Sequence, residues 1–262
     1  MYIVERIKRV GKYYGKIGLT IGNFDGYHLG HQRIVETLIH ECKKRDLFTA
    51  VITFKQHPLK VIRGNEPVKI GARIEKLKWF IQHGIDLLFY IDFSEDFSST
   101  SPSDFLHTLK KELDPRLYCL GKSFRFGNDN EGNIDLMKKY VPLLHYQLIS
   151  IEDVTLGGKA VSSTRIRKAI KKGDFKLVTE LLGRNYSVFL KADQKDQHLL
   201  APFLSNVALP NNGEYSGKLV NLRSHQKVDE RVKVSGSHIE SNEVRVKQGT
   251  LYRFIFDDIV MR

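Results

Sequence analysis

Residues 22–31 read Gly-Asn-Phe-Asp-Gly-Tyr-His-Leu-Gly-His, and this stretch is the most informative part of the chain. It follows an apolar run, residues 17–21, that predicts a buried strand, and it leads into a helical pattern over residues 31–45. A glycine-rich turn between a strand and a helix offers free backbone N–H groups and a partial positive charge to an anion. His28 and His31 can add hydrogen bonds to phosphate oxygens. The stretch therefore predicts a nucleotide-handling loop.

The first 186 residues alternate strand-like and helix-like patterns. Strands are expected over residues 17–21, 48–54, 86–91, 116–120 and 144–149, and helices over residues 31–45, 72–83, 102–112 and 132–140. This alternation predicts an α/β domain with a parallel, Rossmann-like sheet covered by helices on both faces. Ligands bind such sheets beyond the carboxyl ends of the strands, which is where the glycine-rich turn falls. Two short helices, broken at Gly173 and Asp174, are expected over residues 164–183.

The pattern changes after Tyr186. Short alternating apolar runs follow at residues 187–191, 203–208, 214–222, 230–234, 242–247 and 250–258. Turn residues separate these runs, so they predict a small all-β domain, a barrel or a sandwich. The expected domains are residues 1–186 and residues 187–262.

Composition narrows the class of protein. Hydrophobic residues make up 41% of the 262 residues, which predicts a folded core rather than disorder. No apolar run approaches the roughly 20 residues of a membrane helix, and the N-terminus lacks the pattern of a signal peptide. We therefore expect a cytoplasmic protein without a membrane partner. Cys42 and Cys119 are expected to be reduced core thiols.

The formal net charge of +12 predicts a surface that attracts anions. Nucleic acid is one such anion, but we find no nucleic-acid-binding motif with aromatic platforms, and small polyphosphates account for part of the excess. No nucleic-acid partner is expected. His28 and His31 lack the cysteine or carboxylate cluster that would complete a zinc site, so no protein-bound metal is expected either.

A second motif, Ser-Ser-Thr-Arg-Ile-Arg, occupies residues 162–167. Hydroxyl side chains suit the N-cap of a helix, and free N–H groups with hydroxyls and an arginine form a phosphate site. Alone, the motif fits an ordinary capped helix equally well. Paired with the glycine-rich turn, it predicts a second phosphate-binding segment.

Together these motifs resemble the nucleotidylyltransferase superfamily, and within it the bacterial FAD synthetases, the bifunctional riboflavin kinase/FMN adenylyltransferases. That family is marked by a Gly-Asn-Phe-Asp-Gly-x-His-x-Gly-His string, complete here in residues 22–31, and by Ser-Ser-Thr-x-Ile-Arg, present in residues 162–167. A Phe-x-x-His-Pro loop also matches residues 54–58. The resemblance spans residues 15–186 and implies that FMN and ATP, with Mg²⁺, give FAD and pyrophosphate.

The resemblance also implies roles for single residues. His28, His31, Asn23 and Arg165 are expected to act in catalysis. Further contacts to ATP are expected from Gly22, Phe24, Asp25, Gly26, Gly30, Ser162, Ser163, Thr164 and Arg167. Ser163, Thr164 and Arg165 would hold the leaving pyrophosphate, and Asp25 is expected to brace its turn rather than to bind a metal.

Two loops are expected to contact the flavin. The residues concerned are Phe54, His57, Pro58, Ser123, Phe124, Arg125 and Phe126. By composition alone the first loop fits a solvent loop with an exposed histidine. The aromatic rings of the second, residues 121–127, fit either flavin stacking or the cover of a core edge. The family carries Asp or Asn where this chain has Ser123, so the contact of that loop with the flavin is open.

Bifunctional members of the family phosphorylate riboflavin on a C-terminal barrel with a Gly-x-Pro-Thr-x-Asn motif. That motif is absent after Tyr186, although residues 209–215 resemble the barrel's Leu-Pro-x-x-Gly-x-Tyr turn. We therefore expect an FMN adenylyltransferase with a degenerate barrel and no riboflavin kinase activity. The alternatives are a flavin- or ATP-binding sensor without turnover, an adenylyltransferase for a different phosphate acceptor and, from charge alone, an RNA-binding protein. The oligomeric state is left open.

Overall fold

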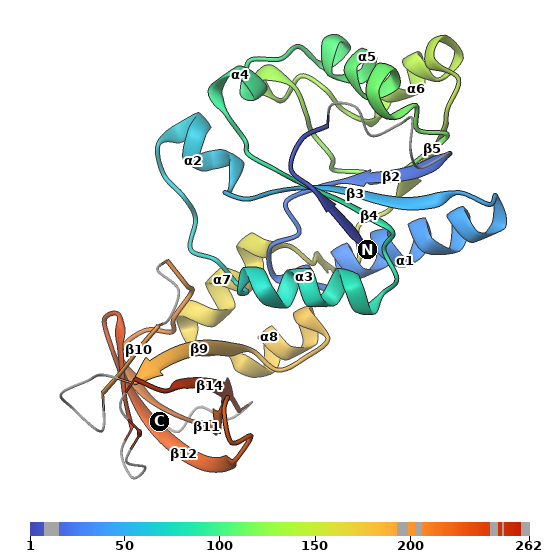
Figure 1. Ribbon diagram of the computed structural model, residues 1–262. Helices are drawn as coiled ribbons and strands as arrows, with labels where there is room; N and C mark the ends of the chain where they lie inside the picture. Colours follow the sequence, from blue (N-terminus) through green and yellow to red (C-terminus); the bar gives the residue numbers. More distant parts are fainter. Residues whose placement is uncertain (8–15, 193–198, 203–205, 242–245, 248, 258–262) are drawn as a thin grey trace. The chain divides into compact units, whose positions relative to one another are not determined.

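The computed structural model describes residues 1–7, 16–192, 199–202, 206–241, 246–247 and 249–257 (Figure 1). The chain forms two compact units. The first comprises Met1–Phe24, Gly30–Pro67 and Leu77–Thr155, and the second comprises Asp25–Leu29, Val68–Lys76 and Leu156–Arg262. Two short pieces from the first half of the chain therefore belong to the same unit as its C-terminal part.

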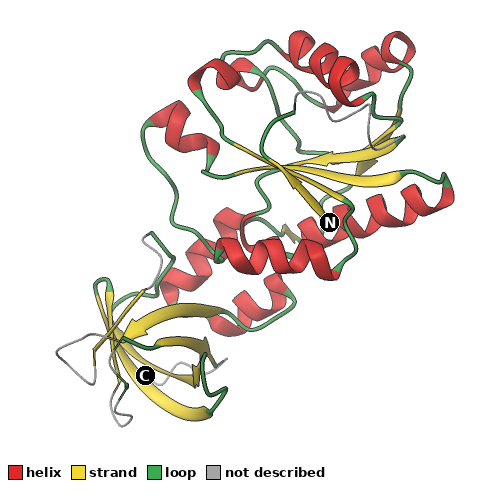
Figure 2. Cartoon of the chain, viewed as in Figure 1, coloured by secondary structure: helices red, strands yellow, loops and turns green. Residues whose placement is uncertain are grey.

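The first unit is built on a parallel sheet, whose strands are yellow in Figure 2. The sheet has six strands in the order β1-β4-β3-β2-β5-β6. Its strands are β1 (Tyr2–Val4), β2 (Ile17–Ile21), β3 (Phe48–Phe54), β4 (Leu87–Ile91), β5 (Leu117–Gly121) and β6 (Gln147–Ile151). The two strands β2 and β4 are buried at every residue, which is typical of parallel strands covered on both faces. The expected Rossmann-like fold class is confirmed.

Helices cover both faces of this sheet. The helices in this part of the chain are α1 (Leu29–Lys44), α2 (Pro58–Arg63), α3 (Arg73–Gln82), α4 (Glu95–Ser98), α5 (Pro102–Leu113) and α6 (Ile134–Leu144). The short helices α2 and α4 contain no buried residue, so the longer helices provide the cover. Helices α5 and α6 lie on the opposite face from α1 (Figure 1). A Cβ atom at Gly18 of β2 would collide with the Cys42 thiol of α1, so this glycine lets the helix lie close to the sheet.

Both cysteines lie buried without a disulfide, as expected of core thiols. Burial raises the pKa of Cys42 and of Cys119 to about 12. These thiols are therefore protonated at neutral pH and are poor nucleophiles.

Short elements escaped the sequence pattern. The strand β1 and the helices α2 and α4 hold three, six and four residues, too few for an apolar period to show. The helix α2 does carry local signals, because Pro58 occupies its first turn and Gly64 ends it with a φ of 67°.

Two helices open the larger part of the second unit, after a two-stranded ribbon formed by β7 (Thr155–Leu156) and β8 (Lys159–Ala160). They are α7 (Ser163–Lys172) and α8 (Phe175–Leu182), so the expected break at Gly173 and Asp174 is confirmed. Gly173 ends α7 with a φ of 72°, and the Asp174 side chain accepts a hydrogen bond from the backbone N–H of Leu177 in α8.

A closed antiparallel barrel follows from Ser187 onward, with the strand order β10-β13-β12-β11-β14-β9. Its strands are β9 (Ser187–Ala192), β10 (Leu199–Pro202), β11 (Gly213–Asn221), β12 (Lys227–Ser235), β13 (His238–Ser241) and β14 (Leu251–Phe256). Alternate residues of β12, namely Glu230, Val232 and Val234, are buried while their neighbours are exposed or half-buried. The expected small all-β barrel is confirmed.

Two strands of the barrel lie elsewhere than expected. The described part of the predicted strand 203–208 forms only a single bridge, in which Val207 pairs with Lys69 outside the barrel. Residues 203–205, 242–245 and 258 lie outside the described residues, and residues 246–247 are not in a strand. Barrel closure uses β10 and β13 instead. The alternation of a short apolar run does not show which other strand it will pair with. The prediction was wrong here because strand formation depends on those partners, which only the tertiary structure provides.

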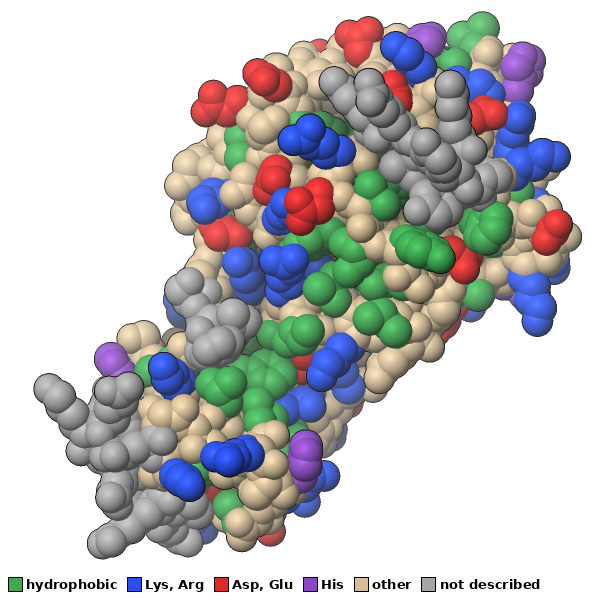
Figure 3. All heavy atoms as spheres, viewed as in Figure 1, with side chains coloured by type: hydrophobic (Ala, Val, Ile, Leu, Met, Phe, Trp, Pro, Cys, Tyr) green, Lys and Arg blue, Asp and Glu red, His purple; other side chains and the backbone are tan. Residues whose placement is uncertain are grey.

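Charge and hydrophobicity are mixed on the face drawn in Figure 3, where Lys and Arg side chains of the first unit are interspersed with Asp and Glu. In the part of the chain that the structure describes, no helix combines the length and the apolar character needed to cross a membrane.

Candidate functional site

The glycine-rich stretch forms a tight turn between β2 and α1. Asp25–Tyr27 make one turn of 3-10 helix, and Gly26 has a φ of 74°. A Cβ atom at Gly26 would lie 2.7 Å from Cγ2 of Ile70. Glycine is therefore required here both by the backbone conformation and by the close approach of Ile70.

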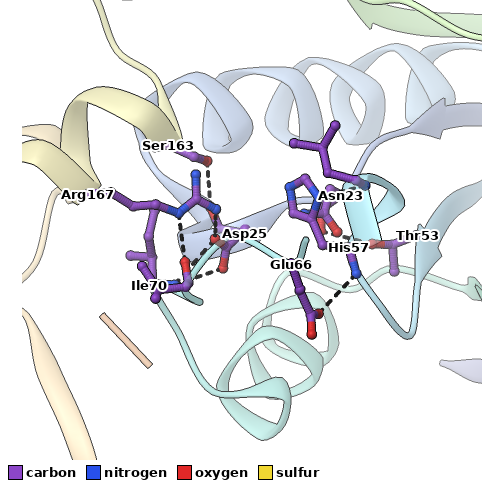
Figure 4. Close-up of polar contacts among 10 residues, drawn as sticks. Asn23, Asp25, Thr53, His57, Glu66, Ile70, Ser163 and Arg167 are labelled. Carbon is purple, nitrogen blue, oxygen red and sulfur yellow. Dashed lines mark hydrogen bonds and ion pairs between the residues drawn. The ribbon is translucent and has the colours of Figure 1, made fainter. Parts of the chain in front are cut away.

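The Asp25 carboxylate holds this turn in place (Figure 4). It accepts hydrogen bonds from the backbone N–H of Ile70 at 3.1 and 3.3 Å and pairs with Arg167 Nη2 at 2.6 Å. The two charged side chains are 11% and 17% exposed, so the pair is largely buried. These contacts have the geometry of a structural brace.

The second sequence motif meets the first at this turn. Ser163 Oγ donates a hydrogen bond to the backbone carbonyl of Asp25 at 3.2 Å, and Arg167 pairs with its carboxylate (Figure 4). The structure thus brings two predicted phosphate-binding segments, which lie more than 130 residues apart in the sequence, into direct contact.

The N-terminus of α7 carries the rest of the second motif. Ser162 caps the helix by accepting from the backbone N–H of Arg165 at 3.3 Å, and Thr164 is exposed. Arg165 Nη1 donates to the backbone carbonyls of Leu156 and Lys159 at 3.0 and 2.8 Å. The helix start is therefore well formed, with Arg165 held against the ribbon of β7 and β8.

His28 follows the turn directly and is buried, with 6% of its surface exposed. Burial and the repulsion of Arg167 lower its pKa to about 4. His28 is therefore neutral at pH 7. A neutral imidazole still carries one N–H that can donate to a phosphate oxygen.

Three cations near Asp25 were not predicted as site residues. Burial, together with the positive charges of Lys69 and Arg73, lowers the pKa of Lys76 to about 8, while Asp25 opposes this shift. Asp25 pairs directly with Arg167 and also attracts the charge of Lys76. The available signal was the spacing of Arg73 and Lys76, because residues three apart share one face of a helix, here α3. Lys69 precedes the helix, and spacing gives no signal for it. Such an excess of positive charge suits a polyphosphate.

Asn23, Phe24 and His31 belong to the first unit. The backbone carbonyl of Asn23 accepts a hydrogen bond from Thr53 Oγ1 at 3.1 Å. The ring of Phe24 is 1% exposed and packs edge-on against His31 and Phe80, at centroid distances of 5.1 and 5.5 Å. The Phe24 side chain anchors the loop in the core, so an ATP contact at this position would have to come from its backbone.

The loop after β3 places His57 at the start of α2. His57 Nδ1 accepts from the backbone N–H of Leu59 at 3.2 Å, and its own backbone N–H donates to Glu66 at 3.2 Å (Figure 4). Pro58 is the first residue of the helix. Half-buried His57 therefore has a capping function, which leaves the expected flavin contact of this loop as a prediction.

The loop after β5 packs its aromatic rings on the core. Phe124 and Phe126 stack at a centroid distance of 5.4 Å, and Phe126, 8% exposed, also packs against Phe105. The rings thus cover a core edge. Ser123 Oγ donates to Asp153 Oδ1 at 3.4 Å, so a carboxylate that sequence reasoning missed lies beside the position where the resembling family has Asp or Asn.

Comparison with known proteins bears on this arrangement. Residues 12–165 match the family model of the FAD synthetases. The chain belongs to the FAD synthetase family. The match covers the turn, both histidines and α7 up to Arg165, whereas the barrel lies outside it.

Some relatives of this chain are named as bifunctional enzymes, and one is named simply as a FAD synthetase. A bifunctional riboflavin kinase/FMN adenylyltransferase of Buchnera aphidicola is 34% identical over 190 residues, covering 72% of this chain and 61% of the relative. A protein from Escherichia coli with the same name is 31% identical over 172 residues, or 65% of this chain and 55% of the relative. A FAD synthetase of Listeria monocytogenes is 27% identical over 215 residues, or 80% and 85%.

The alignment with the two bifunctional relatives from Buchnera covers 61% of the length of each, so this chain spans about three fifths of those proteins. A crystal structure described as a macrolide-efflux protein from Streptococcus pneumoniae has a TM-score of 0.83 at 22% identity, and covers 97% of this chain and 88% of its own. That likeness shows a shared fold.

Proposed function

We propose that this protein transfers the adenylyl group of ATP to FMN and releases FAD and pyrophosphate. The observation that carries the proposal is the contact between the turn before His28 and the start of α7, made by Ser163 and Arg167 on Asp25. Two anion-binding segments joined in this way, in a member of the FAD synthetase family, suit the several charged phosphates of a triphosphate.

In this reaction a phosphate oxygen of FMN attacks the α-phosphorus of ATP, and the bond to the β-phosphate oxygen breaks. The FMN phosphate is already ionised at neutral pH, so the step needs no strong base. Catalysis then depends on positioning and on neutralising charge as it develops. His28 and His31 would donate to phosphate oxygens, with Asn23 binding the triphosphate.

The leaving pyrophosphate requires positive charge and hydrogen-bond donors. Ser163, Thr164 and Arg165 at the start of α7 are our candidates for that role. The cations Lys69, Arg73 and Lys76 lie close enough together for their charges to interact, and they would add to the positive field that a triphosphate meets.

Mg²⁺ fits this scheme as a companion of ATP. The Asp25 carboxylate is occupied by Ile70 and Arg167, and the described residues contain no group of three His, Cys, Asp or Glu suited to a metal. The ion would be held by phosphate oxygens and water, and it would neutralise charge on the triphosphate.

The flavin assignment rests on the loops at residues 54–58 and 121–127. Asp153, hydrogen-bonded to Ser123, supplies an acceptor near the position where a family acid or amide is expected. A different phosphate acceptor remains the second candidate, because the Ser123 substitution changes this loop. A sensor without turnover is disfavoured by the retention of both phosphate motifs.

We also propose that the barrel has no riboflavin kinase activity. The support comes from the sequence. The chain forms a closed barrel after Tyr186, but this part of the sequence lacks the Gly-x-Pro-Thr-x-Asn motif of the riboflavin kinase barrels that it resembles.

The first test is FAD formation, followed by chromatography with flavin fluorescence, with ATP and Mg²⁺ plus either FMN or riboflavin. We expect FAD from FMN and no phosphorylated product from riboflavin. His31→Ala should lower turnover by about 10²-fold, the scale of losing one donor to a charged transition state. FMN or FAD formed from riboflavin would overturn the proposal for the barrel. No FAD from FMN would shift the assignment to another acceptor or to a sensor.

A further inference from the structure

The chain between the barrel strands β10 and β11 contacts the segment Val68–Glu75, which we call the connecting segment. The backbone N–H of Lys69 donates to the carbonyl of Asn206 at 2.7 Å, and the N–H of Ala208 donates back to the carbonyl of Lys69 at 2.8 Å. This two-way pairing is that of a short parallel bridge, and it fixes the connecting segment to the chain between β10 and β11.

An ion pair adds a second attachment. Arg253 Nη2 of β14 lies 3.2 Å from Glu75 Oε1, and Arg253 Nε donates to Ser187 Oγ of β9 at 2.9 Å. The Glu75 side chain is 12% exposed and that of Arg253 is 35% exposed. Glu75 Oε2 also accepts from the backbone N–H of Ala72 at 3.3 Å, so the ion pair reaches the backbone of the connecting segment.

The other side of the connecting segment holds the turn at Asp25–Tyr27. The N–H of Ile70, next to Lys69, donates to the Asp25 carboxylate, and the Ile70 side chain packs where a Cβ of Gly26 would be. Arg167 Nε donates to the carbonyl of Val68 at 2.7 Å while Nη2 pairs with Asp25. The turn is thus supported by residues adjacent to those that the barrel holds.

Arg184 makes a separate link from the start of the barrel. It lies between α8 and β9, donates from Nη2 to the carbonyl of Gly26 at 3.3 Å, and places its guanidinium 4.0 Å from the centre of the Tyr27 ring. Both contacts of Arg184 therefore end on residues of the turn that precedes His28.

We propose that the barrel positions the nucleotide-binding turn, and that Arg253, through Glu75, is a positioning residue for adenylyl transfer. The effect on adenylyl transfer rests on the proposed function, whereas the support of the turn by the barrel rests on the contacts described above. A loosened turn would misplace His28, and a displacement of about 1 Å at a reacting centre can lower a rate by about 10²-fold. Positioning the turn would give the barrel a role that requires no catalytic activity of the barrel itself.

The test compares Arg253→Ala, Arg253→Lys and Glu75→Gln with the unmodified chain. Hydrogen exchange, read by mass spectrometry, should be faster at residues 25–28 in Arg253→Ala without any ligand. We expect kcat for FAD formation and the affinity for a non-hydrolysable ATP analogue each to fall about tenfold, with circular dichroism retained. Arg253→Lys should restore part of both losses. The double variant with Glu75→Gln should be no worse than Arg253→Ala, because the two substitutions remove one interaction.

Lys218→Ala is the matched control. It removes an ion pair with Asp229 between β11 and β12 of the barrel, in which the two side chains are 54% and 87% exposed. This variant should match the unmodified chain in all three measurements. Equal losses in Lys218→Ala and Arg253→Ala would mean general loosening of the barrel and would overturn the inference.

Unchanged exchange at residues 25–28 in Arg253→Ala would also overturn it. The proposed function fails separately, if the unmodified chain makes no FAD from FMN. In that case the exchange and ATP-affinity measurements still decide whether the barrel positions the turn.

Discussion

At the scale of single residues, the charge state of His28 links the site to stability. Its pKa is about 4 in the folded protein, against about 6.5 in an unfolded chain. The unfolded state therefore binds more protons between these pH values, and stability falls as the pH is lowered from about 6.5 to about 4. The shift corresponds to roughly 3 kcal/mol at the acid end of this range.

His28→Gln should remove this contribution, so its unfolding temperature should fall less between pH 7 and pH 5 than that of the unmodified chain. Thermal melts across this range would measure the difference. His40→Gln, at an exposed position on α1, is the control and should leave the change of unfolding temperature with pH as it is in the unmodified chain. If the unfolding temperatures of the unmodified chain and of His28→Gln fell equally between pH 7 and pH 5, the lowered pKa of His28 would be contradicted.

The Asp25–Arg167 pair is the second residue-scale feature with a measurable consequence. Arg167→Ala leaves a carboxylate that is 11% exposed without its cation, and breaking such a pair costs about 3 kcal/mol. Urea unfolding should show this loss. The pKa of His28 should rise in the same variant, because a repelling charge is removed.

Lys138→Ala provides the comparison, since it breaks an exposed ion pair with Asp135 and should not move the urea midpoint. Equal midpoints for Arg167→Ala and the unmodified chain would show that the pair is not a brace.

At the scale of elements, the turn between β2 and α1 depends on a glycine that is crowded as well as left-handed. Gly26→Ala adds a Cβ 2.7 Å from Ile70, whereas Gly64→Ala, at a similar φ of 67°, meets nothing within 4 Å. Both substitutions incur the left-handed penalty of about 1 kcal/mol. Only Gly26→Ala should add strain and weaken ATP binding. Urea unfolding with calorimetric titration of ATP would separate the two, and equal effects would exclude crowding at Gly26.

At the scale of the whole molecule, the net charge of +12 should act on ATP through the field around the turn. The KM for ATP is expected to rise several-fold between low and high salt, because ions screen exposed charges over about a Debye length. Lys76→Met should raise the KM at low salt and reduce its salt dependence. Steady-state assays over a potassium chloride series would test this, and a salt-independent KM would mean that steering by charge plays no part.

Most of the longer local elements could be predicted from the amino-acid sequence alone. β2 and β3 occupy the predicted residues 17–21 and 48–54, and the helix break at Gly173 lies where glycine and an N-cap aspartate place it. Strand, helix and turn preferences depend on neighbours within a few positions, so a local pattern is enough to predict them. The same is true of the glycine-rich turn and of the capped start of α7, whose motifs also identified the family.

Tertiary structure decided which distant residues meet. The Asp25–Arg167 pair joins positions 142 residues apart, and neither the contact of Ile70 with Gly26 nor the low pKa values of His28 and Lys76 can be read from spacing. Burial sets those pKa values, and burial exists only once the chain is packed. Pairing partners likewise depend on the whole fold. Val207 pairs with Lys69 rather than with a barrel strand, and this pairing ties the chain between β10 and β11 to the segment that holds the turn at Asp25–Tyr27.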